Sequence, residues 1–115
     1  MKIIVEDRLA AFIVKVQGRI DIGVGEVKLR DCLTRLDLKG VDVVILDLAK
    51  VSHVDSSGMG ELIACYSHFR KNGVELCLSN LNTRVYSLMV LTQMITIFPV
   101  YDSNEDALMN LVKAA

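Results

Sequence analysis

The stretch from Val43 to Gly60, VVILDLAKVSHVDSSGMG, joins a continuous apolar run to a pair of serines flanked by small residues. The run from Val43 to Leu46 is apolar throughout and mostly β-branched, which is typical of a strand buried on both faces of a sheet. A helical apolar period then begins near Ser57. The stretch therefore predicts a buried strand, a loop and a helix, and the apolar stripe of that helix is Met59, Leu62, Ile63, Tyr66 and Phe69.

The segments before this stretch predict a hairpin and a helix. Two apolar runs, Ile3 to Glu6 and Ala10 to Val16, read as paired strands. A glycine-flanked loop, Gly18 to Gly25, leads into a helix that we expect to end at Lys39-Gly40, as at a glycine C-cap. The apolar positions of this helix recur at i, i+3, i+4 and i+7, and they are Leu29, Cys32, Leu33 and Leu36.

The segments after it predict two further strand–helix units. Val74 to Leu78 reads as a strand, and Ile95 to Val100, which contains Pro99, as a short last strand at an edge of the sheet. Ser103 and Asp106 approximate a capping box at the start of a final helix. The apolar positions of the two helices are Val85, Leu88 and Met89 in the first and Ala107, Leu108, Leu111 and Val112 in the second.

Strands that alternate with helices predict an α/β fold. We expect one domain over residues 1–115, with a mostly parallel sheet of four to five strands, an N-terminal antiparallel edge strand and about four helices. In such sheets functional groups gather where strands end and helices begin. The segment Asp47 to Gly60 is the richest junction of this kind.

Composition argues against several classes of function. The net charge is −1 with both signs interleaved, and the chain has three Phe, three Tyr and no Trp, so neither a basic patch nor a stacking platform for nucleic acid is evident. No apolar run reaches the roughly 18 residues of a membrane span. Glu6 and Asp7 come too early for a signal peptide, so we expect a cytoplasmic protein.

The cysteines and histidines do not suggest a metal or thiol site. Cys32, Cys65 and Cys77 form no CxxC pair, and His53 and His68 are not placed near them at zinc-ligand spacing. Free cysteines are often buried, and we interpret all three as core residues. No metal and no cofactor are expected.

The serine pair permits a structural and a regulatory interpretation. Asp55, Ser56 or Ser57 can simply cap the helix, satisfying its free amides. A phosphate at the same place is compatible with the fold, because the N-terminus of a helix carries partial positive charge. Gly58 and Gly60 weaken the first turn by up to about 1 kcal/mol each, and access for another protein to the serine is one reason for their presence.

Enzyme motifs are absent around these serines. A nucleophile elbow requires Gly-x-Ser-x-Gly, but Val54 and Asp55 stand two positions before Ser56 and Ser57. Nothing in the sequence orients His53 as a base. There is no P-loop, and Gly23-Val24-Gly25 is only a fragment of GxGxxG. We therefore expect a non-enzymatic protein. An unrecognised small enzyme is an alternative hypothesis with less support.

The chain resembles the STAS domain family, and within it the bacterial anti-sigma-factor antagonists. The resemblance covers nearly the whole chain and rests on Asp47-Leu48 followed by Val54-Asp55-Ser56-Ser57-Gly58-Met59-Gly60. Gly18-Arg19-Ile20-Asp21, Ile97-Phe98 and the segment from Asp102 to Leu108 also match the family's elements. After the third helix, where family members commonly carry a glycine-leucine pair, this chain has Thr92-Gln93-Met94.

The resemblance implies a partner switch. Ser57 corresponds to the residue that is phosphorylated, and the kinase is the anti-sigma factor itself, an ATP-binding protein. The unphosphorylated antagonist binds this kinase and releases a sigma factor, and a serine phosphatase reverses the modification. The implied partner-binding residues are Asp21, Asp55, Ser56, Ser57, Gly58, Met59 and Gly60.

The resemblance leaves a second function open. Standalone STAS proteins also serve as non-catalytic subunits of larger assemblies, either stress-signalling scaffolds or lipid transporters, and Ser57 would then be only a cap. The sequence also leaves open whether Ser56 is modified and whether the chain forms a homodimer.

Overall fold

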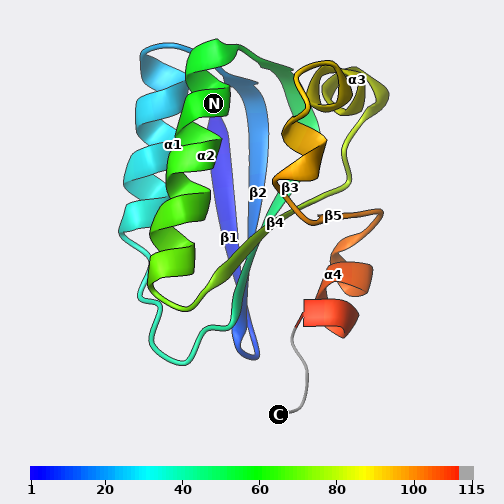
Figure 1. Ribbon diagram of the computed structural model, residues 1–115. Helices are drawn as coiled ribbons and strands as arrows, with labels where there is room; N and C mark the ends of the chain where they lie inside the picture. Colours follow the sequence, from blue (N-terminus) through cyan, green and yellow to red (C-terminus); the bar gives the residue numbers. More distant parts are fainter. Residues whose placement is uncertain (112–115) are drawn as a thin grey trace.

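The computed structural model describes the backbone of residues 1–111 and the side chains through Asn110. Within this range strands and helices alternate after an N-terminal hairpin (Figure 1). The elements are β1 (Lys2–Arg8), β2 (Ala11–Ile20), α1 (Val24–Thr34), β3 (Val43–Val54), α2 (Ser56–Lys71), β4 (Glu75–Ser79), α3 (Thr83–Leu91), the 3₁₀ helix η1 (Met94–Thr96), β5 (Val100–Tyr101) and α4 (Asn104–Leu111).

The five strands of the described chain form one sheet in the order β1-β2-β3-β4-β5. β1 pairs with β2 in antiparallel register, and the other three pairs are parallel. The prediction of a mostly parallel α/β sheet with an N-terminal antiparallel edge strand is therefore confirmed. Figure 1 shows α1 and α2 together on one side of the sheet and α4 on the other.

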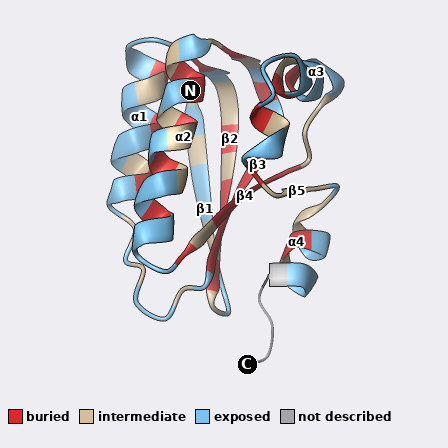
Figure 2. Ribbon diagram, viewed as in Figure 1, coloured by how far each residue is buried: buried red, intermediate tan, exposed pale blue. Residues whose placement is uncertain are grey.

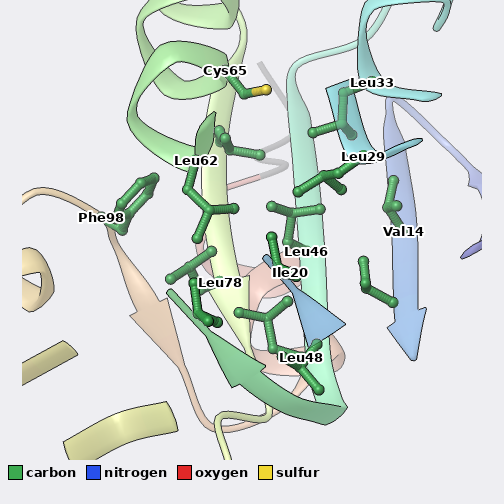
Figure 3. Packing of buried hydrophobic residues seen from close by; sticks show 14 of the residues in the cluster. Val14, Ile20, Leu29, Leu33, Leu46, Leu48, Leu62, Cys65, Leu78 and Phe98 are labelled. Atoms are coloured by element: carbon green, nitrogen blue, oxygen red, sulfur yellow. The ribbon is translucent and has the colours of Figure 1, made fainter. Parts of the chain in front are cut away.

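The main core lies between the sheet and the helices α1, α2 and α3. β3 runs through its centre, and the apolar run Val43–Leu46 is buried as predicted, as are Asp47 and Leu48 after it (Figure 2). Leu29 and Leu33 of α1 and Leu62 of α2 pack against this strand (Figure 3). Such close packing of strand and helix residues is the main source of stability.

A smaller apolar cluster lies on the opposite side of the sheet, beneath α4. It consists of Ala11, Ile13, Val43, Ile45, Cys77 and Ala107. Burial raises the pKa of the Cys77 thiol to about 12, and burial next to Glu61 does the same for Cys65, so both remain protonated at neutral pH. Cys32, expected in the core, is only half-buried.

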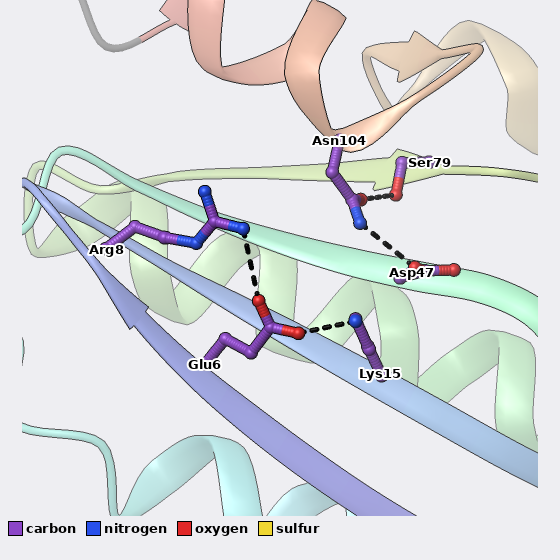
Figure 4. Close-up of polar contacts among 6 residues, drawn as sticks. All are labelled: Glu6, Arg8, Lys15, Asp47, Ser79 and Asn104. Atoms are coloured by element: carbon purple, nitrogen blue, oxygen red, sulfur yellow. Dashed lines mark hydrogen bonds and ion pairs between the residues drawn. The ribbon is translucent and has the colours of Figure 1, made fainter.

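A buried polar contact fixes α4 to the sheet. The amide nitrogen of Asn104 donates to the Asp47 carboxylate at 3.0 Å, and the Ser79 hydroxyl donates to the amide oxygen of Asn104 (Figure 4). Asp47 is only 8% exposed and Ser79 is fully buried. Buried polar groups need hydrogen-bond partners, and the Asn104 side chain provides one for Asp47 of β3 and one for Ser79 of β4.

Several element boundaries differ from the sequence predictions. β2 continues through Gly18 to Ile20, and β3 continues to Val54 where a loop was expected. α1 ends at Thr34, not at Lys39-Gly40, because the apolar face of the helix is finished at Leu33 and Leu36 is only half-buried. The predicted strand Ile95–Val100 is wrong in most of its length, since it overlaps η1 and only Val100 lies in β5.

The start of α4 agrees with the capping prediction. The Ser103 hydroxyl accepts a hydrogen bond from the Asp106 amide at 3.1 Å, and α4 begins at the next residue, Asn104. Ala107 is buried and Leu108 half-buried, as predicted. The predicted core positions Leu111 and Val112 lie outside the described side chains. No helix in residues 1–111 has the length and apolar character needed to cross a membrane.

Candidate functional site

The candidate site lies at the carboxyl ends of the neighbouring strands β2 and β3. The two strands are parallel, and their last residues, Ile20 and Val54, are paired in register. The loop after β2 therefore lies beside the junction between β3 and α2. A single residue, Asp55, separates that strand from that helix.

Asp55 is the N-cap of α2. One carboxylate oxygen accepts the Gly58 amide at 2.8 Å, and the other accepts the Ile22 amide at 3.0 Å. These two hydrogen bonds hold the pKa of the Asp55 carboxyl below its usual value, and the bond from Gly58 has the larger effect. Asp55 is thus ionised at neutral pH and connects the helix start to the loop after β2.

Because Asp55 provides the cap, the two serines are not required for it. Ser56 is exposed and Ser57 is half-buried, both in the first turn of α2. Within residues 1–111 neither hydroxyl makes a side-chain hydrogen bond to another protein group. Asp55 is therefore the capping residue among the three candidates that the sequence left open, and within residues 1–111 the serine hydroxyls are not used for the cap.

The two glycines of the segment have different roles. A Cβ atom at Gly58 would lie 2.1 Å from the Ile20 carbonyl oxygen, so this position needs glycine for the contact between α2 and β2. The sequence-based explanation that Gly58 provides access is therefore wrong. At Gly60 an added Cβ meets nothing within 4 Å, so access remains an explanation for Gly60 alone.

The remaining predicted partner-binding residues divide between surface and core. Asp21 is half-buried and forms an ion pair with Arg19 at 2.8 Å, while its backbone oxygen accepts the Glu26 amide at 2.9 Å. Met59 is buried, and its sulfur lies 3.8 Å from the Thr92 hydroxyl. Asp21 thus shapes the surface loop, and Met59 packs the start of α2 against the end of α3.

Sequence reasoning missed two apolar residues beside the serines. Ile22 is 73% exposed and Val24 is 79% exposed, and the Ile22 amide is the group bound by Asp55. The signal for them was the pattern Ile22-Gly23-Val24 inside a glycine-flanked loop, where apolar side chains have no core to enter. Exposed apolar residues grouped at one place are typical of protein interaction surfaces.

The histidine next to this site is not arranged as a catalytic base. His53 is half-buried near the end of β3, where it is paired with Arg19. Among the described residues no hydrogen bond joins its imidazole to Ser56 or Ser57. The nucleophile–base contact of a serine hydrolase is therefore not present in this arrangement.

The comparisons with known proteins agree with this fold. The STAS domain family model matches residues 2–107, so the chain belongs to the STAS domain family. Two relatives are named antagonists. An anti-sigma F factor antagonist of Paenibacillus polymyxa is 23% identical over 96% of this chain and 95% of that protein. An anti-sigma-B factor antagonist of Bacillus subtilis (strain 168) is 33% identical over 80% of this chain and 83% of that protein.

A solved structure shares the architecture. The crystal structure of an anti-sigma factor antagonist from Mycobacterium paratuberculosis aligns with a TM-score of 0.85 at 24% identity, covering 97% of this chain and 94% of that one. At this identity the likeness establishes the fold: a five-stranded mixed sheet with helices on both sides.

Proposed function

We propose that this chain is an anti-sigma factor antagonist whose partner binding is controlled by phosphorylation of Ser57. The observation that carries the proposal is the division of roles at the start of α2. Asp55 caps α2 and also binds the loop after β2, and within residues 1–111 the Ser57 hydroxyl has no side-chain hydrogen bond. The names of the two relatives support the antagonist role.

The site tolerates a phosphate without a change of fold. The first turn of α2 carries the partial positive charge of a helix N-terminus, which favours an added anion. Phosphorylation adds about 1.5 to 2 negative charges next to the ionised Asp55. The domain stays folded, and the consequence falls on a protein that docks over this helix end.

The electrostatic effect on such a partner is large enough for a switch. An unpaired charge buried in an interface costs about 2 to 5 kcal/mol. At about 1.4 kcal/mol per tenfold, this corresponds to roughly 30-fold to several-thousand-fold weaker binding. The docking surface in this proposal comprises Asp21, Ile22, Val24, Ser56, Ser57 and Gly60.

The partner in this proposal is an ATP-binding anti-sigma factor that is also the serine kinase for Ser57. The unphosphorylated form binds it and releases a sigma factor, and a serine phosphatase restores that form. This cycle takes place in the cytoplasm. Its basis is the resemblance of the segment Val54–Gly60 to the antagonists, together with the position of the exposed Ser56 and the half-buried Ser57 in the first turn of α2.

The test uses Ser57→Ala and Ser57→Asp as baits in native extract, with Ser56→Ala and Ser56→Asp as matched controls one residue away. The proposal predicts that Ser57→Ala retains an anti-sigma kinase and Ser57→Asp loses it, while both Ser56 variants retain it. Incubating the retained kinase with ATP and wild-type chain should then add one phosphate at Ser57, located by mass spectrometry. If all four baits capture the same complex equally and no phosphate appears, Ser57 is a structural residue of an assembly subunit.

A further inference from the structure

The outer edge of β1 is an unpaired strand edge. Within residues 1–111 β1 pairs with β2 only, and its seven residues carry no proline and no irregularity of register. Ile4 and Val5 are 38% and 40% exposed there. Unpaired backbone groups on an edge of this kind are a template for another strand.

We propose that two copies of this chain pair through β1, antiparallel about a two-fold axis at Ile4, to form one continuous ten-stranded sheet. In this register Lys2 lies opposite Glu6 of the second copy, and Ile3 lies opposite Val5 of the second copy. Residues opposite one another in an antiparallel pair share a face and interact directly. Two opposite-charge pairs and two apolar pairs thus surround the axis.

The charges of β1 favour this register over those whose axis lies farther along the strand. Successive side chains of a strand alternate between the faces, so a continuous sheet allows the axis only at a residue, not between two. With the axis at Val5, Lys2 lies opposite Arg8 of the second copy, and with the axis at Glu6, two Glu6 carboxylates face each other. The edge charges, which often prevent strand pairing, are therefore complementary about Ile4.

The ion pairs of the single chain are consistent with this pairing. Glu6 contacts Lys15 of β2 and, at 3.3 Å, Arg8 on the face of the sheet opposite α1 and α2 (Figure 4). Lys2 lies on that same face, and it makes no ion pair or side-chain hydrogen bond within the described chain. A second copy brings this free ammonium group to the Glu6 cluster.

The helix beside this edge also leaves room for a second copy. Lys28 of α1 donates to the Met1 carbonyl at 2.7 Å, which places one flank of the helix over the start of β1. Arg30 pairs with Glu61 at 3.3 Å, which places the other flank against α2. The flank toward β1 contains a hollow of about 520 Å³, lined by Val24, Val27, Lys28, Asp31, Cys32 and Arg35.

In the paired arrangement the two Ser57 sites remain separate. Ser57 lies on α2, whereas the pairing involves β1 and the far flank of α1. Because the two β1 strands run in opposite directions, the carboxyl ends of β2 and β3, where the serines lie, are at opposite ends of the dimer. One dimer therefore presents two docking surfaces, one at each end, and Val24 belongs both to a docking surface and to the hollow beside the pairing edge.

The first test is sedimentation of the whole chain and its charge variants. Wild type should be a concentration-dependent dimer, and Lys2→Glu should weaken it on the order of tenfold, because two cross-strand pairs change from attraction to repulsion. The exchange Lys2→Glu with Glu6→Lys should restore the dimer, and Lys39→Glu in an exposed loop should leave it unchanged. A wild-type monomer, or a double variant as weak as Lys2→Glu, would overturn the proposal.

The second test fixes the register. Opposite residues in an antiparallel pair have Cα atoms about 4.5 to 5.5 Å apart, within the range of a disulfide. Ile4→Cys should therefore form a cross-linked dimer on mild oxidation. Val5→Cys, whose partner in this register is Ile3, should not. Equal cross-linking of both variants, or of neither, would exclude pairing about Ile4.

Discussion

The carboxylate of Asp55 accepts the backbone amide of Ile22 at 3.0 Å, a contact between residues 33 positions apart in the sequence. Its other oxygen accepts the Gly58 amide at 2.8 Å. One side chain thus holds an exposed apolar loop against the helix that carries the serines. The geometry of the proposed docking surface depends on the ionisation of this single group.

The contribution of Asp55 to stability should depend on pH. Because its folded-state pKa lies below the reference value of 3.8, the unfolded chain binds the proton more readily. The stabilisation is therefore complete above the unfolded pKa and is lost as pH falls through the folded pKa. Asp55→Asn should be less stable than wild type at pH 7, and the difference should shrink below about pH 4.

Urea unfolding from pH 7 to pH 3 measures this difference. Asp102→Asn is the matched control, since Asp102 is exposed and its substitution removes the same charge. The control should follow wild type at every pH. A constant difference between wild type and Asp55→Asn across the range would contradict the role of the ionised carboxylate.

Two glycine substitutions in the same helix should have opposite effects. Gly58→Ala places a methyl group 2.1 Å from the Ile20 carbonyl oxygen, and it should lower the free energy of unfolding by about 1 to 3 kcal/mol. Gly60→Ala meets open space and should raise it by about 0.5 to 1 kcal/mol. Denaturant titration of both variants decides the matter, and equal stabilities would show that α2 does not contact β2 at Gly58.

Asn104→Ala should loosen α4. The substitution leaves the Asp47 carboxylate and the Ser79 hydroxyl without their shared partner in a buried place, at a cost of about 1 to 3 kcal/mol. Amide hydrogen exchange should accelerate in α4 more than in β3 or α2. Asn110→Ala, which removes an exposed hydrogen bond to the Asp106 carbonyl, is the control and should change stability by less than about 0.5 kcal/mol.

Gln93→Gly should stabilise the chain. Gln93 has φ 61° and ψ 14°, a left-handed conformation that is costly for residues with a Cβ atom. It stands in the segment Thr92-Gln93-Met94, which directly follows α3. Thermal and urea unfolding should show a gain of about 0.5 to 1 kcal/mol for Gln93→Gly, and none for Gln93→Ala, because alanine keeps the Cβ.

The sequence by itself determined the order of the elements, the buried strand and the position of the serine pair at a helix start. These features follow from local sequence: β3 begins with the apolar run Val43–Leu46, and α2 repeats its apolar residues at helical spacing. The hairpin of β1 and β2 was visible for the same reason. The resemblance to the STAS family rested on the short segment that joins β3 to α2.

Only the tertiary structure decided which residue caps α2, why Gly58 is glycine and what fixes α4. The last two depend on an atom from a distant part of the chain, the Ile20 carbonyl for Gly58 and the Asp47 carboxylate for Asn104. Asp55 caps α2 locally through the Gly58 amide, and its second oxygen binds the distant Ile22 amide. The short β5 and the early end of α1 were also missed, since propensity extends an element until packing ends it. Local sequence sets which backbone conformations are favourable, and contacts between distant segments select the side chains that satisfy their polar groups.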